Sequence, residues 1–202
     1  MARTPKVVED RREQIIDAAM RVFAQKGFSR ATNKDIAREA GITPGLIYHY
    51  FENKEAVFQA IVEGRSPLPL LRTLPAQVLA QPPETFLRFV IREVLAIIED
   101  EKFVQLIRMV LPEVIHHPSV SPIPIGVLAQ AVDVLRHYFV SKMESGELRQ
   151  ADPVLATQTL VSCLMGFVLR RQILQDPSVL SYSHEQIADA IVEMVLIGLR
   201  PH

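Results

Sequence analysis

The sequence predicts an all-α protein, and three observations favour this fold class. Apolar residues recur every three to four positions along most of the chain, which is the spacing of one face of a helix. No segment alternates apolar and polar residues for long enough to indicate a strand. The chain has only 8 glycines among 202 residues, too few for a β-rich protein with many tight turns. Because 49% of the residues are apolar, the expected helices can bury sizeable cores.

Charge and cysteine content narrow the class of protein further. The chain has 22 Lys and Arg against 23 Asp and Glu, so no global field indicates a nucleic acid or a membrane as its partner. Its one cysteine, Cys163, cannot form an intrachain disulfide, and the N-terminal residues lack the apolar segment of a signal peptide. We therefore expect a cytoplasmic protein in which Cys163 is an inert, buried hydrophobe. The longest apolar stretch, 154–169, is shorter than the ~20 residues of a membrane span. We therefore expect no membrane, and a helix there that is buried on most of its sides, in a core or in an oligomer interface.

Local start and stop signals divide the chain into nine expected helices. Gly27 ends the first helix. Thr32 and Asp35 have the spacing of a capping box at the start of the second, and Thr43, followed by a proline, is the N-cap of the third. Five prolines between residues 65 and 83 indicate a linker with room for a short helix around 70–80. The expected helices cover roughly residues 8–26, 32–40, 43–51, 53–64, 84–100, 102–116, 125–145, 153–174 and 184–199.

The segment 32–54 carries the most specific information about function. Two short helices are joined by the turn 41–43, which is the arrangement of a helix-turn-helix, whose second helix enters the DNA major groove. A small side chain at Ala37 lets the two helices pack closely, Gly41 supplies the permissive backbone of the turn, and Thr43 leaves backbone N–H groups for a phosphate oxygen. The residues expected to contact DNA are Thr32, Thr43, Pro44, Gly45, Leu46, Tyr48, His49 and Lys54.

The expected DNA contacts differ in kind along this segment. The first turn of the second helix meets base edges. Tyr48 and His49 present polar tips on aromatic rings and suit phosphate contacts, and Lys54, at the start of the next helix, complements the charge of the DNA backbone. Arg3 and Lys6 are further candidates for phosphate contacts, from a flexible arm.

A dense pattern between residues 15 and 55 resembles one protein family. The residues that carry it are Ile15, Ala18, Ala19, Phe23, Gly27, Thr32, Ile36, Ala37, Ala40, Gly41, Ile42, Thr43, Gly45, Ile47, Tyr48, His49, Tyr50, Phe51, Lys54 and Glu55. This pattern resembles the tetracycline-repressor (TetR) family of bacterial transcription regulators. The turn 146–153 before an apolar helix also looks like the entry to the penultimate, dimer-forming helix of such regulators.

The resemblance implies a homodimeric regulator with two domains, a helix-turn-helix DNA-binding domain at 1–55 and a larger helical ligand-binding and dimerisation domain at 56–202. A small molecule in the second domain shifts the recognition helices, so that the affinity for the double-stranded DNA operator falls and a repressor is released or, less often, the affinity rises. Two features depart from the family. Leu46 stands where many relatives carry a small polar residue, which leaves contact with a thymine methyl as the alternative to hydrogen-bonded readout. The proline-rich stretch 65–83 interrupts a helix that is often long and continuous.

Large apolar side chains on the central helices have two interpretations, a plain core or the lining of an effector cavity. Few polar groups fall among them, so the cavity favours a mainly apolar or aromatic molecule over a highly charged one. The candidate lining residues are Phe86, Phe103, Ile107, Met109, Leu164 and Phe167.

The two last helices are too apolar to face water on their outer sides. Packing against the same pair of a second subunit buries such surface as a four-helix interface. The residues expected to supply the dimer surface are Leu160, Val161, Leu164, Val168, Ile191, Met194 and Val195.

Two other classes of protein stand as alternatives: a helical ligand-binding or metal-dependent enzyme with a helix-turn-helix-like segment, and a dimeric scaffold without DNA binding. Glu113 and His116 share one helix face, but the second E-x-x-H motif of a di-iron bundle is missing. No serine or cysteine nucleophile stands in a recognisable motif. We therefore expect no catalytic residue, no metal site and no cofactor, and the DNA-contact set argues against the scaffold.

Overall fold

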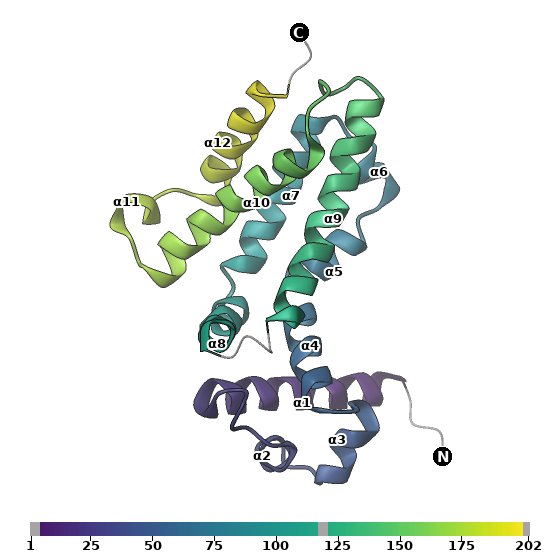
Figure 1. Ribbon diagram of the computed structural model, residues 1–202, viewed down its shortest axis with the longest axis vertical. Helices are drawn as coiled ribbons and strands as arrows, with labels where there is room; N and C mark the ends of the chain where they lie inside the picture. The colour runs from purple at the N-terminus through teal and green to yellow at the C-terminus, as the bar shows by residue number, and fades with distance from the viewer. Residues whose placement is uncertain (1–4, 117–120, 200–202) are drawn as a thin grey trace. The chain divides into compact units, whose positions relative to one another are not determined.

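The computed structural model describes residues 5–116 and 121–199 of the chain. These residues form helices and connecting turns with no strand among them, so the predicted all-α fold class is confirmed (Figure 1). The candidate contact Arg3 lies outside the described residues, as does the side chain of Lys6. The helices are α1 (Pro5–Lys26), α2 (Asn33–Glu39), α3 (Pro44–Tyr50), α4 (Lys54–Arg65), α5 (Leu68–Arg72), α6 (Ala76–Leu79), α7 (Pro83–Ile98), α8 (Glu101–His116), α9 (Pro122–Glu144), α10 (Pro153–Val168), a π-helical turn (Leu169–Ile173), α11 (Pro177–Leu180) and α12 (His184–Ile197).

Packing divides the chain into two compact units. The first unit comprises Met1–Arg65 and Gln105–Val127, and the second comprises Ser66–Val104 and Leu128–His202. The DNA-binding domain predicted at 1–55 stays a prediction, but the packing unit that contains it also includes α4 and most of α8. The proline-rich stretch forms two short helices, α5 and α6, and is anchored by the buried side chains of Leu68 and Leu71.

In the first unit, α1 packs against α2 and α4, and α2 packs against α3 (Figure 1). Three phenylalanines form the centre of the core beneath the end of α1. The Phe23 ring lies 5.3 Å from the Phe28 ring, and the Phe58 ring lies 4.9 Å from that of Phe28, centroid to centroid. Gly27 ends α1, as predicted, with a φ of +77° that disfavours any residue with a Cβ.

The predicted capping box at the start of α2 is confirmed. The Thr32 hydroxyl accepts a hydrogen bond from the Asp35 backbone N–H, and the Asp35 carboxylate accepts one from the Thr32 N–H. The same carboxylate forms ion pairs with Lys26 at 2.6 Å and with Arg38 at 2.9 Å. Hydrogen bonds from Lys26 and Thr32 lower the pKa of Asp35 from 3.8 to about 2.

We expect the Asp35 carboxyl to titrate near pH 2 in a carbon-detected NMR titration. Its folded-state pKa lies below the unfolded value, so its contribution to stability is present above about pH 4 and is lost as the pH falls towards 2. Lys26→Met should raise this pKa, because Lys26 donates the hydrogen bond that lowers it most. Lys34→Met, an exposed change on the same helix, serves as the control. An Asp35 pKa near 3.8 in the parent protein would contradict the assigned contacts.

In the second unit, α7 packs against α12 and α10. Phe86 of α7 is fully buried, and its ring stacks on that of Tyr138 from α9, with centroids 3.6 Å apart and planes 15° from parallel. The Tyr138 hydroxyl donates to the backbone oxygen of Gln81, and burial raises the pKa of this phenol well above its usual range. Two predicted helix starts are confirmed, because Asp152 caps α10 and Ser183 caps α12.

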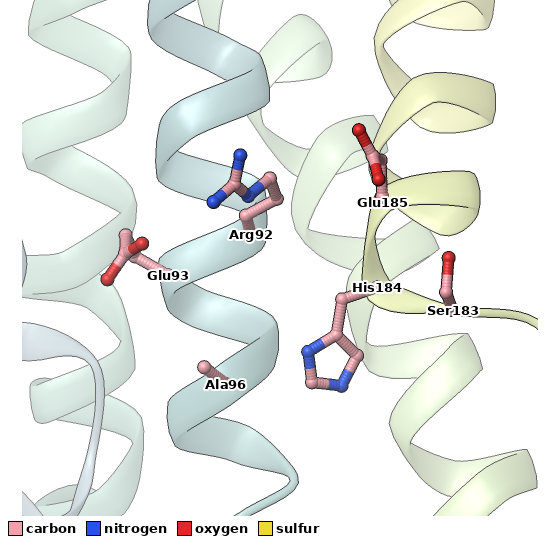
Figure 2. Close-up of a pocket in the computed structure, with 6 residues that line it drawn as sticks. All are labelled: Arg92, Glu93, Ala96, Ser183, His184 and Glu185. Atoms are coloured by element: carbon pink, nitrogen blue, oxygen red, sulfur yellow. The ribbon is translucent and has the colours of Figure 1, made fainter.

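A charged network joins the end of α7 to the π-helical turn and to the start of α12. The Glu99 carboxylate accepts from the Arg171 guanidinium at 2.5 and 3.1 Å and lies 2.6 Å from His184 Nε2. Arg171 also donates to the backbone oxygens of Val179 and Tyr182, which holds the segment around α11 in place. A hollow of about 450 Å³ lies beside this network, and Figure 2 shows His184 between α12 and α7 at its edge.

Candidate nucleic-acid interface

The turn between α2 and α3 has the local geometry of a helix-turn-helix. Gly41 adopts a φ of +65°, and the N–H of Ile42 donates to the Ala37 oxygen at 2.9 Å, which closes the end of α2. Ala37 and Ala40 are buried, as close packing of the two helices requires. Gln14 of α1 donates to the Ala40 oxygen at 2.7 Å, so the turn is fixed to the longest helix of the unit. The sequence contains no signal for this last contact, because 26 residues separate its partners.

One face of α3 is anchored and the other is exposed. Ile47 is fully buried, and Phe51 after the helix is buried beneath the Arg12 guanidinium. Tyr48, on the other face, is 59% exposed. Six of the predicted DNA-contact residues lie on α3 or at its N-cap. Of these, Thr43, Pro44, Gly45, Tyr48 and His49 are exposed, and Leu46 is half-buried.

Thr32 and Thr43 behave differently as helix caps. The Thr32 side chain is exposed but engaged, because its hydroxyl also donates to the Asp35 carboxylate at 2.8 Å. Thr43 is the N-cap of α3, as predicted, but its side chain makes no capping hydrogen bond. The Thr43 hydroxyl therefore makes no hydrogen bond that caps α3, whereas the Thr32 hydroxyl stabilises the start of α2.

The Lys54 ammonium group binds the backbone of its own chain, and the phosphate contact predicted for it stays a prediction. Its ammonium group donates to three backbone oxygens, those of Phe28 at 2.7 Å, Ala31 at 3.1 Å and Ser29 at 3.4 Å. It also lies 4.3 Å from the centroid of the Phe28 ring. An ammonium has three protons to donate, so these carbonyls use the whole group. The sequence placed Lys54 correctly at the start of α4 but gave no indication that the turn after α1 comes within its reach.

Two family models match the chain and together cover most of it. Residues 15–61 match the model described as bacterial regulatory proteins of the tetR family. Residues 85–198 match the model of the C-terminal domain of AefR-like transcriptional repressors. The chain belongs to the TetR family of transcriptional regulators. The resemblance read from residues 15–55 is thereby confirmed.

Individual TetR-family proteins resemble the chain over different lengths. SrpR of Pseudomonas putida is 47% identical over 72 residues, which are 35% of this chain and only 34% of SrpR. AcrR of Shigella flexneri is 27% identical over 184 residues, covering 82% of this chain and 81% of AcrR. The solved complex of SmeT with triclosan superimposes with a TM-score of 0.73 at 25% identity, covering 95% of this chain and 92% of SmeT. The relative with the higher identity is thus matched over the shorter stretch of the chain.

Two helices of the described chain are long and apolar enough, by length and composition alone, to cross a membrane. They are Pro122–Glu144 and Pro153–Ile173. The π-helical turn makes the second of these helices longer than the apolar stretch 154–169, so its length does not exclude a membrane span. One or two such helices are weak evidence for a membrane protein, and the family models that match the chain describe transcriptional regulators.

The predicted effector residues do not all belong to one packing unit. Ile107 and Met109 group with the first unit, and the remaining four group with the second. Met109 lines a groove of about 370 Å³ between α1 and α8 in the first unit. Ile107 and Phe167 are half-buried, and the others, Phe86, Phe103, Met109 and Leu164, are buried.

Most residues predicted for the dimer surface are buried within the subunit itself. Leu160, Leu164, Val168, Ile191 and Val195 face its interior, and Val161 is half-buried. Met194 is 78% exposed, and its place in a dimer surface stays a prediction. The prediction that Cys163 is buried is wrong, because this cysteine is exposed on α10. The apolar side chains that these helices and the following turn expose are Val154, Leu155, Met165, Leu169, Met194 and Ile197.

Proposed function

We propose that the protein is a transcriptional repressor that binds a double-stranded DNA operator as a homodimer through α3. The observation that carries this proposal is the exposed face of α3, which presents Tyr48 and His49 beside a first turn that contains Gly45. The missing side chain of Gly45 lets this turn approach base edges closely. The buried Ile47 fixes this face outward. Membership in the TetR family supports the same function, and the chain needs no catalytic group for it.

The experiment that tests DNA binding is selection of duplexes from a random pool by the purified protein. We expect enriched duplexes that are pseudo-palindromic, with half-site centres about one helical turn, or ~34–36 Å, apart or a modest departure from it. Binding should weaken steeply with salt, because phosphate contacts release counterions. A pool that yields no enriched sequence, or an affinity that does not respond to salt, would rule the function out.

We propose that the dimer forms through the exposed apolar faces of α10 and α12. Leu155 is 65% exposed and Met194 is 78% exposed, and further exposed apolar side chains lie on the same two helices. Two such helices from each subunit complete a four-helix interface. The exposed Cys163 lies on the same helix as Leu155 and is covered in such a dimer.

Met194→Glu should convert the dimer into a folded monomer, because the interface would bury an unpaired carboxylate. Sedimentation at micromolar concentration measures the change. Leu79→Glu replaces an exposed apolar residue of α6 and should leave the dimer intact. Val168→Glu does not test the interface, since Val168 is buried inside the subunit and its replacement would unfold the protein directly. A parent protein that sediments as a monomer would refute the proposal.

We propose that the effector is a mainly apolar or aromatic molecule bound in the second unit. The inner faces of α7 and α10 carry large apolar side chains and few polar groups. The solved SmeT structure contains triclosan, an aromatic compound, and SmeT matches nearly the whole chain. The effector need only prefer one state of the dimer by ~1–3 kcal/mol to change operator affinity ~5–150-fold.

Phe167→Ala is expected to leave DNA binding intact and to abolish release by the effector. Phe167 is half-buried in the last turn of α10, so its loss removes ligand contact at a smaller cost to the core than the loss of Phe86. Release of a selected duplex by triclosan measures the response, and Phe89→Ala, an exposed change on α7, is the control. Equal release in the parent and in Phe167→Ala would place the ligand elsewhere.

A further inference from the structure

Two side chains of opposite charge hydrogen-bond to the backbone of the turn that connects α1 to α2. On one side, the Lys54 ammonium of α4 binds the backbone oxygens of Phe28, Ser29 and Ala31. On the other, the Glu113 carboxylate of α8 accepts a buried hydrogen bond of 2.8 Å from the Phe28 N–H. The backbone of Phe28 is therefore held at its N–H by an anion and at its oxygen by a cation.

Glu113 also approaches Gly27 closely. The positive φ of Gly27 disfavours a side chain there, and a Cβ would lie 2.7 Å from Glu113 Oε1, the far end of a flexible side chain. Glu113 is also among the few charged residues buried in the described part of the chain. Such burial is costly unless the carboxylate is hydrogen-bonded, and the Phe28 N–H supplies one such bond.

The turn held in this way sets the position of the DNA-binding helices. It leads directly into Thr32, whose capping box starts α2, and α2 packs against α3. The Phe28 ring is fixed in the same place by Phe23, Phe58 and the Lys54 ammonium above it. A shift of the turn must therefore move the start of α2, and with it the base of the recognition helix.

We propose that Glu113 and Lys54 are positioning residues for the helix-turn-helix: together they clamp the turn 27–31 and so fix α2 and α3 in the geometry that binds DNA. Glu113 lies outside the segment that resembles a DNA-binding domain and contacts no base or phosphate in this role. It reaches the turn from α8, which enters the first unit at Gln105. The effect on DNA rests on the proposed function, and the effect on the turn does not.

Amide hydrogen exchange in the DNA-free protein tests the clamp by itself. Glu113→Leu and Lys54→Met should each accelerate exchange at residues 28–37 roughly tenfold, because each removes charge-assisted hydrogen bonds. Glu113→Gln keeps a side-chain oxygen that accepts from the Phe28 N–H, so it should restore most of the protection. Amides in the middle of α1, from Ile15 to Phe23, should change little. Uniform acceleration across the unit, or unchanged exchange at 28–37, would overturn the proposal.

DNA affinity at several salt concentrations separates positioning from phosphate contact. Lys54→Met should weaken binding to a selected duplex roughly tenfold without changing the slope of affinity against salt, because no phosphate contact is lost. Glu113→Leu should act in the same way, and the exposed changes Lys102→Met and Glu144→Leu are the controls. A salt slope reduced by about 0.9 in Lys54→Met would mean that Lys54 binds phosphate and would overturn its role in the clamp.

The hydrogen-exchange experiment and the DNA-binding experiment can each fail independently of the other. If the parent protein selects no duplex, the proposed DNA-binding function is wrong, and hydrogen exchange still decides whether Glu113 and Lys54 hold the turn. If it selects a duplex but exchange at 28–37 is insensitive to both variants, the function stands and the clamp is wrong.

Discussion

Replacing Gly45 by glutamate is expected to abolish sequence-specific DNA binding while the protein stays folded. Gly45 lies in the exposed first turn of α3, where a Cβ would meet no atom within 4 Å and the backbone has no positive φ. A new side chain therefore fits the free protein. In the complex it would bring a carboxylate against base edges and phosphates, and like-charge contacts at an interface cost several kcal/mol. We expect a loss of affinity of roughly a thousandfold, measured by fluorescence anisotropy on a selected duplex.

The control for this prediction is Gly64→Glu. Gly64 lies on α4, is exposed, and also has no atom within 4 Å of the Cβ position. The two variants add the same charge to the same unit, so a non-specific effect of net charge would weaken both equally. Thermal unfolding should show both variants folded. Equal affinities of Gly45→Glu and the parent protein would show that α3 does not enter the groove.

Arg171→Met is expected to destabilise the protein by about 3–5 kcal/mol, since it leaves a buried carboxylate without its main partner. The Arg171 and Glu99 side chains are only 11% and 10% exposed. Removing the guanidinium leaves Glu99 with His184 and also frees the backbone oxygens of Val179 and Tyr182. Urea denaturation at one fixed protein concentration measures the loss, because unfolding of a dimer depends on concentration.

The neighbouring arginine provides a matched control. Arg170 pairs with Asp176 at 2.7 Å, but its side chain is 49% exposed, so solvent replaces the lost contact. Arg170→Met should cost no more than about 1 kcal/mol. Similar losses in the two variants would mean that burial of the Glu99 network contributes nothing to its strength.

The sequence by itself determined the fold class, the helix starts and the family. A cap at Thr32 and helices from 153 and 184 were predicted, and Thr32, Asp152 and Ser183 each accept from a backbone N–H two or three residues ahead. Gly27 was predicted as a helix end in the same way. A helix cap or helix end depends on hydrogen bonds between residues a few positions apart, so a short stretch of sequence is enough to predict it. The helix-turn-helix pattern is local for the same reason.

Only the tertiary structure decided which side of an apolar helix faces inward and where long side chains end. Leu155 is exposed and Leu160 is buried. The sequence does not distinguish the two, because α10 is apolar nearly all round and has no polar face that would indicate its orientation. From the sequence, Lys54 is a candidate for a phosphate contact. The tertiary structure adds that its ammonium group donates to the backbone oxygens of Phe28 and Ala31. Glu113 bonds to Phe28 across 85 residues. Such contacts depend on how helices pack, and no local pattern in the chain encodes them.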